Sequence, residues 1–311
     1  MNNDIILDLS TVKDGMSFSN VNSFLSSFTT KSYGEGKVYG SGILTCQGDN
    51  LTIKVWDKNL IDMIVKGVYV GNVVTFTGTT KIYQGALELT VTDMKLNPNI
   101  SKVDFLPTTE GLSSLQEEFI NFINTKISQP YVKTLLAVFN GENILQLFCK
   151  EYAGSKMHDA KIGGLLNHTV KMLRLAETLV KSDVRLEPYK DIIFSGVILH
   201  DIGKVQEMNL GIYTVNSFPT HRVFGIEMLC RHKNDIVAEI GETNYYHLQC
   251  IIQGHHGQWG ESPKTVWAYV VHLIDMLDSA TTGIMDKIER GEVSEEYGSK
   301  KVYTNDSKLV F

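Results

Sequence analysis

The pattern of apolar and polar positions divides the chain into two parts. Between residues 15 and 97, short β-type segments end at turns rich in glycine, asparagine and aspartate. Residues 51–57 alternate apolar with polar side chains, as a strand with one buried face does, and residues 38–44, 68–78, 81–83 and 86–91 continue the β-type pattern. With one helical stretch at 59–66, the pattern predicts a small barrel of about five strands, and the OB-fold is the leading candidate.

The pattern becomes helical beyond residue 112. Residues 98–112 are polar and contain two prolines, which is typical of a linker, whereas residues 165–180 carry an apolar stripe with helical spacing. Further helices are expected to begin at Pro188, His221 and Pro263. The predicted fold class is therefore multidomain, β then α, with an OB-like barrel at 1–97, a linker at 98–112 and an all-α helical bundle with a C-terminal tail at 113–311.

Composition narrows the class of protein. Hydrophobic residues make up 43% and charged residues 21% of the 311 positions, as in ordinary globular proteins, and no apolar run is long enough to span a bilayer. The first residues resemble no secretory signal and the four cysteines are far apart, so we expect reduced thiols and a cytoplasmic location. A net charge of −6 disfavours tight non-specific binding to duplexes, although bound divalent cations would reverse the sign locally.

Histidine is confined to one part of the chain. All nine histidines lie between His158 and His272, and His200-Asp201 follows directly on the apolar run 192–199. An imidazole and a carboxylate at the end of a buried segment can bind one divalent cation, and Lys204 adds positive charge at the same place. This combination suits metal-dependent hydrolysis of a phosphate ester. The dipeptide itself is common, so its meaning depends on further ligands.

Two further ligands are available at sensible places. His168 lies on the apolar helix 165–180, where the alternative is a core histidine bonded to a neighbour. Asp275 lies among apolar residues, and burying its carboxylate is costly unless a cation or donor meets it. A salt bridge is the alternative interpretation of Asp275.

These residues resemble the ligand set of the HD-domain metal-dependent phosphohydrolases. The resemblance implies that four residues surround one divalent metal ion: His168, His200, Asp201 and Asp275. Three more match members of that superfamily with two ions, which implies that Asp201 bridges the ions and that His221, His255 and His256 hold the second. The alternative is a single ion with the His255-His256 pair contacting phosphate. Asp201 and Lys204 are the expected catalytic residues, Lys204 by stabilising phosphoryl charge, unless Lys204 is a solvated surface lysine.

The order of the domains resembles the YhaM-type 3′→5′ exoribonucleases over most of the chain. The segments that carry the resemblance are 51–57, 163–169, 200–204, 255–257 and 272–278. It implies hydrolysis of single-stranded RNA, and of DNA as a second substrate, to nucleoside monophosphates, with Mn²⁺ as the favoured ion and a homo-oligomer as a reasonable assembly. Two features depart from the family: Asp159 stands where a second histidine is common after His158, and no arginine precedes Arg174.

The barrel supplies candidates for binding a single strand. OB barrels bind unpaired bases by aromatic stacking in a modestly basic groove. The candidates, each of which could instead be packing or ordinary surface, are Tyr39, Lys54, Trp56, Lys81 and Tyr83 in the barrel, together with His158 in the helical part. Tyr33 and Lys37 belong to the same group of barrel residues.

Two other functions stay open at this point. One is an HD phosphohydrolase acting on a small or cyclic nucleotide, with the barrel in a regulatory role. The other is a single-strand-binding module without catalysis, which the complete ligand set disfavours. Imidazole and carboxylate ligands also suit Fe²⁺, Ni²⁺ and Zn²⁺, so the sequence does not fix the metal or whether one or two ions bind.

Overall fold

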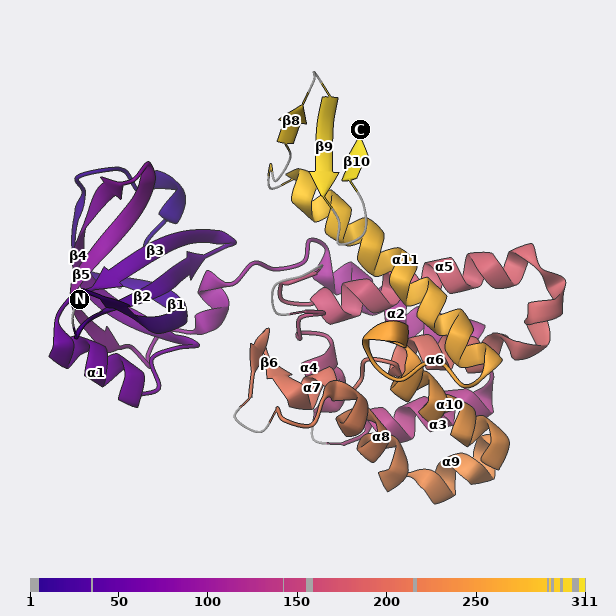
Figure 1. Cartoon of the computed structure of the whole chain (residues 1–311). Helices are drawn as coiled ribbons and strands as arrows, with labels where there is room; N and C mark the ends of the chain where they lie inside the picture. Colours follow the sequence, from indigo (N-terminus) through magenta and orange to yellow (C-terminus); the bar gives the residue numbers. More distant parts are fainter. Residues whose placement is uncertain are drawn as a thin grey trace. The chain divides into compact units, whose positions relative to one another are not determined.

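The computed structural model describes most of the chain and separates it into two compact units (Figure 1). The described residues are 6–34, 36–141, 143–154, 159–214, 217–289, 291, 294–296, 299–303 and 308–310. Contacts group Met1–Thr108 into one unit and Thr109–Phe311 into the other. Within the described residues, no helix combines the length and the apolar character that crossing a membrane requires.

The first unit is a closed five-stranded barrel. Its strands are β1 (Ser17–Tyr33), β2 (Lys37–Cys46), β3 (Asp49–Val55), β4 (Asn72–Tyr83) and β5 (Ala86–Leu96), in the order β1-β2-β3-β5-β4. Helix α1 (Lys58–Lys66) lies between β3 and β4 in the chain, and β3 pairs with β5 in parallel. This is the topology of the OB-fold, so the predicted barrel is confirmed.

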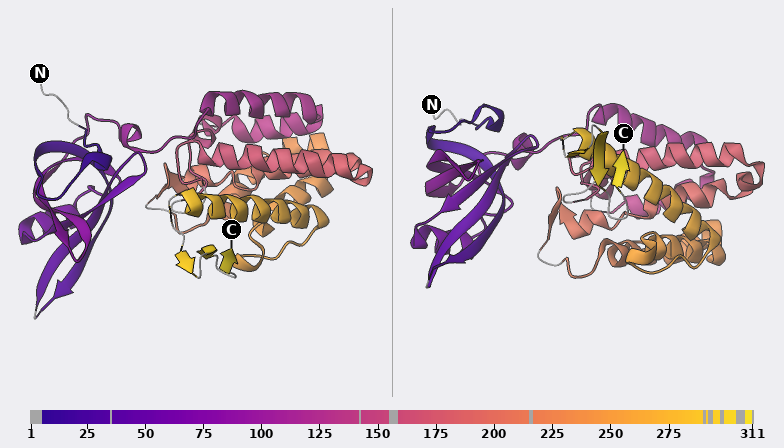
Figure 2. Two further views of the ribbon diagram at one scale, coloured as in Figure 1. Left: turned by 90° about the horizontal axis from the view of Figure 1, so that it is seen from above. Right: turned by 45° about the horizontal axis from the view of Figure 1, so that its top comes forward.

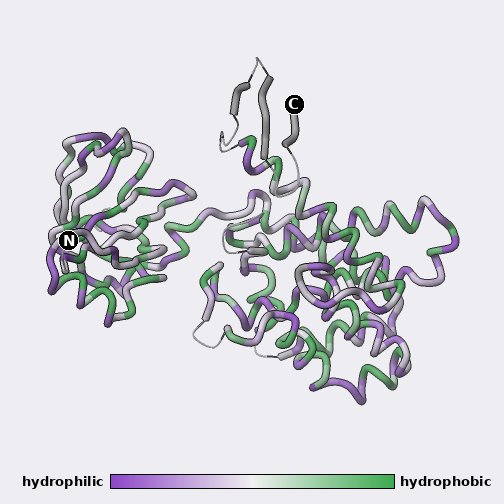
Figure 3. Tube along the Cα trace, viewed as in Figure 1, coloured by the Kyte–Doolittle hydropathy of each residue, from purple (hydrophilic) through white to green (hydrophobic). Residues whose placement is uncertain are grey.

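Two tight turns and an alternating pattern explain the barrel. Gln47-Gly48 and Gln84-Gly85 both have positive φ at both residues, the conformation that a two-residue hairpin turn requires. On β3, Ile53 and Val55 are buried while Lys54 between them points to the outer face. The trace in Figure 3 shows the same mixture of hydrophobic and hydrophilic residues around the barrel.

Residues just after β5 pack against the barrel. The short 3-10 helix η2 (Lys102–Phe105) lies within the segment predicted as a linker, and Phe105 is fully buried. The backbone N–H of Gln47 donates to the Phe105 carbonyl oxygen at 2.7 Å. A second 3-10 helix, η1 (Leu9–Thr11), precedes β1.

The second unit is a helical bundle around one apolar core. Its 3-10 helices are η3 (Val184–Tyr189) and η4 (Gly257–Trp259), and its α-helices are α2 (Leu112–Lys126), α3 (Gln129–Phe139), α4 (Ile144–Phe148), α5 (Gly164–Ser182), α6 (Lys190–Leu199), α7 (Lys204–Glu207), α8 (His221–Arg231), α9 (Lys233–Ile240), α10 (Glu242–Gly254) and α11 (Val266–Glu289). Helix α6 is buried along 192–199, which places it at the centre of the bundle. Helices α5 and α11 lie side by side (Figure 2).

Several local features differ from the sequence prediction. Pro188 lies inside η3 and α6 begins two residues later, while α11 begins three residues after Pro263. The bundle also carries a two-stranded hairpin, β6 (Met208–Asn209) and β7 (Ile212–Tyr213), and a three-stranded sheet of β8 (Ser294–Glu296), β9 (Ser299–Tyr303) and β10 (Lys308–Val310). These strands are too short to leave a periodic pattern in the sequence.

Candidate metal centre

The structure brings all seven predicted metal ligands together in the helical unit. They come from five places: His168 from α5, His200 and Asp201 from the end of α6, His221 from the first turn of α8, His255 and His256 from the end of α10, and Asp275 from α11. Each has a ligand atom within 3.5 Å of a ligand atom of another member.

Helix α6 and the turn after it position the central pair. His200 caps α6 with helical dihedral angles, and Asp201 begins the turn into α7. At Gly203 a Cβ atom would lie 1.9 Å from the His221 carbonyl oxygen and 2.6 Å from the Gly225 nitrogen. Glycine is therefore needed at this position for α7 and α8 to approach closely enough to place His221 beside Asp201.

Substituting Gly203 tests this close approach. We expect Gly203→Ala to lower the free energy of unfolding by about 2–3 kcal/mol, because backbone atoms of α8 have to move. Gly283→Ala is a matched control, since a Cβ atom there meets nothing within 4 Å and the loss of a helical glycine stabilises by about 0.5–1 kcal/mol. Denaturant titration of both variants measures the two effects. Equal stability of Gly203→Ala and the wild type would contradict the steric argument.

The first group of ligand atoms surrounds the Nε2 atom of His168. That atom lies 3.3 Å from His200 Nε2 and 3.4 Å from Asp275 Oδ1. His200 Nε2 in turn lies 3.3 Å from Asp201 Oδ2. Two nitrogens each about 2.1 Å from one ion would be about 3.0–3.4 Å apart at octahedral or tetrahedral angles, so these separations suit a shared cation.

The second group surrounds the other oxygen of Asp201. Asp201 Oδ1 lies 3.5 Å from His221 Nε2 and 3.4 Å from His255 Nε2. His221 Nε2 is 3.0 Å from His256 Nε2. Asp201 therefore presents Oδ2 to the first group and Oδ1 to the second, which is the arrangement that a bridging carboxylate requires.

Two buried atoms of these groups have no hydrogen-bond partner: Asp201 Oδ1 and His255 Nε2. An unpaired polar atom in a protein interior costs about 1–3 kcal/mol, so such atoms are rare. Both face the second group, where a cation would satisfy them. The donor set and the unpaired atoms therefore fit divalent metal ions.

Hydrogen bonds at Nδ1 orient four of the imidazole rings. His200 Nδ1 lies 2.7 Å from the Val197 carbonyl oxygen, and His255 Nδ1 lies 2.8 Å from that of Ile252. A proton on Nδ1 leaves Nε2 free for a metal ion, and acceptors of this kind are common around metal-bound histidines.

Two of the acceptors are carboxylates that are not among the predicted site residues. Asp278 Oδ2 is 2.7 Å from His168 Nδ1, and Glu207 Oε2 is 2.9 Å from His221 Nδ1. Both carboxylates are buried. A signal existed for Asp278, because it lies three residues after Asp275 and so near the same face of α11. Glu207 pairs with a residue across an irregular loop, and spacing gives no signal for that.

Burial and neighbouring charges set the protonation of the rings. Burial lowers the pKa of His255 to about 4, and burial together with the neighbouring His255 lowers the pKa of His256 to about 3. Burial also acts to lower the pKa of His168, but hydrogen bonds with Asp275 and Asp278 outweigh it and raise that pKa to about 9. Neutral imidazole is the form that binds metal, so His255 and His256 are ready for it, whereas at His168 an ion would replace a proton.

Lys204 lies against the carboxylate of Asp201. Its Nζ atom donates to Asp201 Oδ2 and to the Ala153 carbonyl oxygen, both at 2.5 Å, and its side chain is 11% exposed. Burial acts to raise the pKa of Asp201, but Lys204 and His200 hold it well below its usual range. Lys204 is thus no solvated surface lysine.

One histidine outside the ligand set, His272, lies close to it. His272 Nδ1 lies 2.5 Å from the His255 carbonyl oxygen, which connects α11 to the end of α10. His158, a predicted contact for nucleic acid, lies outside the described residues.

On the barrel, three aromatic rings and one lysine form a surface that we call the aromatic face: Tyr33, Tyr39, Lys54 and Trp56. The rings of Tyr39 and Trp56 are stacked with centroids 5.1 Å apart, and Lys54 Nζ lies 5.0 Å from the Tyr39 centroid. Tyr33 meets the Trp56 ring edge-on at 5.3 Å. The Trp56 side chain is 49% exposed, so it is not part of the barrel core.

The other two barrel candidates extend this outer face. Lys81 on β4 lies opposite Glu88 on β5 in the strand register. The Glu88 carboxylate forms an ion pair of 3.4 Å with Lys54 on β3. Tyr83 lies beside the β4–β5 turn and is 58% exposed. The predicted barrel residues therefore share one side of β2, β3, β4 and β5.

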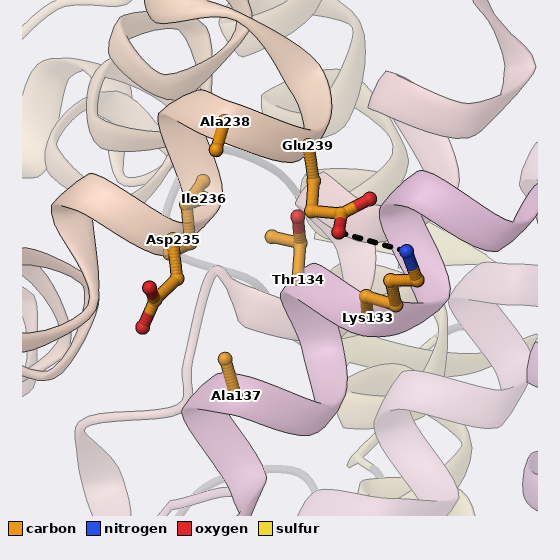
Figure 4. A pocket seen from close by; sticks show the side chains of 7 residues that line it. All are labelled: Lys133, Thr134, Ala137, Asp235, Ile236, Ala238 and Glu239. Carbon is orange, nitrogen blue, oxygen red and sulfur yellow. Dashed lines mark hydrogen bonds and ion pairs between the residues drawn. The ribbon is translucent and has the colours of Figure 1, made fainter.

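An open cleft of about 300 Å³ lies elsewhere in the helical unit, between α3 and α9 (Figure 4). Its one ion pair joins Lys133 to Glu239 at 2.8 Å, and both side chains are substantially exposed. None of the predicted site residues lines it. The buried metal-ligand groups, with their unpaired atoms, are the stronger candidate for chemistry.

Comparison with known proteins gives one family model that matches the helical unit and relatives that match most of the chain. A family model described as HD domain matches residues 165–280, which contain all seven ligand candidates. The 3′-5′ exoribonuclease YhaM of Listeria welshimeri is 26% identical, over 89% of this chain and 89% of that protein. The protein of the same name from Shouchella clausii is 30% identical, over 72% of this chain and 73% of that protein. The chain belongs to the YhaM family.

The YhaM family relationship covers barrel and bundle together, because the matched length exceeds either unit. Among solved structures, the mitochondrial single-stranded DNA-binding protein Rim1 of S. cerevisiae matches 29% of this chain and 100% of its own, at 21% identity and a TM-score of 0.25. A TM-score this low does not establish a shared fold. The OB-fold is therefore assigned from the strand order of this YhaM-family chain.

Proposed function

We propose that this YhaM-family chain is a metal-dependent 3′→5′ exonuclease that hydrolyses single-stranded RNA, and single-stranded DNA as a second substrate, to nucleoside monophosphates. The observation that carries the proposal is the position of Asp201, whose two carboxylate oxygens each face a separate group of imidazole nitrogens. Membership of the YhaM family supports the choice of substrate.

Two divalent ions are proposed, and Mn²⁺ is the favoured metal. His168, His200 and Asp275 would hold one ion, His221, His255 and His256 the other, and Asp201 both. Bound divalent ions supply a nucleophile by lowering the pKa of water and neutralise charge on the phosphate. A mixed set of imidazole and carboxylate ligands suits Mn²⁺.

The chain's own residues orient the ligands and balance charge. The acceptors on Nδ1 fix the imidazole rings with Nε2 facing the centre. Lys204 places an ammonium group against Asp201, which offsets part of the negative charge that accumulates when a phosphate enters. This contact supports the catalytic role proposed for Lys204.

The aromatic face supports binding of a single strand. Exposed rings of Tyr33 and Trp56 offer stacking surfaces, and Lys54 supplies positive charge beside them. Stacking accepts any base, which suits an enzyme that moves along a strand. A barrel tethered to the metal centre raises the local concentration of polymer there, and we propose that this happens in the cytoplasm.

The decisive experiment is product analysis. Purified protein with Mn²⁺ and a single-stranded RNA labelled at its 5′ end is expected to give a ladder of fragments shortened one nucleotide at a time from the 3′ end. The unlabelled product is expected to be nucleoside 5′-monophosphate, because cleavage of the bond between the phosphorus and the 3′ oxygen of the preceding residue leaves a 3′-hydroxyl on the shortened strand. A blocked 3′ end is expected to stop the reaction, and a matched duplex is the control for strand preference.

The alternative enzyme, a phosphohydrolase of small or cyclic nucleotides, predicts different results. Exonuclease activity should depend on the aromatic face: Trp56→Ala should raise KM for a long strand roughly 5- to 150-fold, the range given by about 1–3 kcal/mol of stacking per base. Hydrolysis of a dinucleotide should change little, and Tyr246→Ala, an exposed tyrosine on α10, should change neither. Cleavage of cyclic nucleotides with no shortening of RNA would refute the exonuclease proposal.

A further inference from the structure

A lysine beside the first group of ligand atoms connects three parts of the helical unit. Lys171 lies on α5, three residues after His168, and its Nζ atom donates to Asp159 Oδ2 at 2.7 Å and to Thr282 Oγ1 at 2.6 Å. The same atom lies 3.2 Å from Asp278 Oδ2. The loop at Asp159, helix α5 and helix α11 therefore meet at one ammonium group.

The ammonium group occupies the place of a cation between buried carboxylates. The side chains of Asp159 and Asp278 are 2% and 5% exposed, and that of Lys171 is 25% exposed. Asp159, His168 and Asp278 have ligand atoms close enough together to hold a metal ion. Because Lys171 already balances both carboxylates at contact distance, we assign this cluster a role in support of the metal centre instead of a third ion.

Asp278 transmits this arrangement to the metal-ligand group. The oxygen that faces Lys171, Oδ2, is also the acceptor 2.7 Å from His168 Nδ1. Orientation of the His168 ring, and hence the direction of its Nε2 atom toward His200 and Asp275, depends on where this oxygen lies. Lys171 therefore restrains the same oxygen that accepts from the ring.

Asp159 is itself held in place. Its Oδ1 atom accepts a hydrogen bond of 2.7 Å from Asn167 Nδ2, and its backbone carbonyl accepts from Lys161 at 2.9 Å. Its φ of 53° is uncommon for a residue other than glycine. Gly164 also approaches closely, since a Cβ atom there would lie 1.9 Å from the backbone carbonyl oxygen of Asp159. The backbone of Asp159 therefore has little room to move. Asp159 thus gives Lys171 a fixed partner.

We propose that Lys171 and Asp159 are positioning residues for the metal ion of the first group, acting through Asp278 on His168. The inference rests on the proposed function in taking this group as metal-binding. It applies to one ion only, because the second group has its own carboxylate acceptor, Glu207 on α7, against His221. The two ions are therefore supported by separate parts of the bundle.

The test counts ions. Each protein is dialysed against Mn²⁺ at about ten times the wild-type dissociation constant, and retained manganese is measured by elemental analysis. Wild type is expected to retain about 1.8 ions per chain, because each site is then about nine-tenths filled. Loss of such a supporting contact weakens metal binding about 10- to 100-fold, so Lys171→Met and Glu207→Gln are each expected to retain about 1.0–1.4 ions and the double variant about 0.2–1.0.

Lys181→Met is the matched control, because Lys181 lies on the same helix with its side chain 68% exposed and is expected to leave both ions in place. The Mn²⁺ concentration that half-activates RNA hydrolysis should rise about 10-fold or more in Lys171→Met, while kcat at saturating Mn²⁺ stays within a few-fold of wild type. A purely structural role would lower kcat and thermal stability without this shift.

The outcomes separate the inference from the proposed function. Retention of two ions by Lys171→Met, in a protein that still shortens RNA, would overturn the inference alone. Equal weakening of both ions by Lys171→Met would also overturn it. Failure of the wild type to bind Mn²⁺ would overturn the proposed function. If Lys171→Met does not fold, Asp159→Asn decides, because it keeps an acceptor for Lys171 but removes the charge and should weaken one ion only.

Discussion

Asp201→Asn is expected to lower kcat for single-stranded RNA by about 10³-fold or more and to weaken both metal ions. The substitution keeps the shape of the side chain but removes the charge that both ligand groups share through Oδ1 and Oδ2. Charge stabilisation by metal ions is worth several kcal/mol, and each ~1.4 kcal/mol corresponds to a factor of ten in rate. Single-turnover assays with labelled RNA measure the effect.

The control for that variant is Asp235→Asn, an exposed aspartate on α9, which should leave activity unchanged. Because Asp201 is buried beside Lys204, the variant's thermal stability is measured in parallel. Binding of single-stranded RNA through the aromatic face should persist, which shows that the barrel is folded, and the thermal transition reports on the helical unit that contains Asp201. A variant with both ions bound and more than a tenth of wild-type kcat would show that Asp201 is no bridging ligand.

Removal of metal is the second large effect. Dialysis against a chelator is expected to abolish RNA hydrolysis and to lower the melting temperature of the helical unit by about 10–20 °C. Each ion present at about 100 times its dissociation constant stabilises the folded state by about 2.7 kcal/mol, so two ions contribute about 5.4 kcal/mol, and about 1 kcal/mol corresponds to about 2–4 °C in a unit of this size. The structural reason is that Asp201 Oδ1 and His255 Nε2 are buried without a hydrogen-bond partner.

Differential scanning calorimetry with and without chelator measures the shift. The barrel is an internal control, since all seven ligand candidates lie within 165–280 and its unfolding should not respond to metal. Added Mn²⁺ should restore both activity and stability, and comparison with Fe²⁺, Ni²⁺ and Zn²⁺ identifies the preferred ion. Full activity after complete removal of divalent ions would contradict the metal-dependent mechanism.

Local sequence patterns predict much of the fold. The alternation at 51–57 and the turn Gln84-Gly85 gave the correct strands of the barrel, because side-chain direction and turn conformation depend on neighbouring residues. The long first strand, β1, is not among the predicted strands, because its buried residues, 21–25, are contiguous and do not alternate with exposed ones, and two of them, Asn22 and Ser23, are polar. Pro188 is expected to begin a helix but lies inside η3.

The sequence likewise predicts some residues of the candidate site and not others. His200-Asp201 and the confinement of histidine to one half of the chain indicate a metal centre, and the order of residues matches the HD-domain pattern. Glu207 and Lys171 carry no such signal, and Asp278 has only its spacing of three residues from Asp275. Each is an ordinary charged residue whose role comes from the residue that the fold places opposite it.

By itself, the sequence determined the order of the two units and the kinds of ligand residue in the second. An OB-like barrel comes first, and imidazole and carboxylate ligands follow on successive helices. Only the tertiary structure decided how these groups meet. It turned the two oxygens of Asp201 toward different imidazoles, paired Lys171 with two buried carboxylates and left Trp56 on the surface. The physical reason is range, because helix and strand periodicity reflect neighbours a few residues apart, whereas each of these contacts depends on the packing of whole elements around a common core.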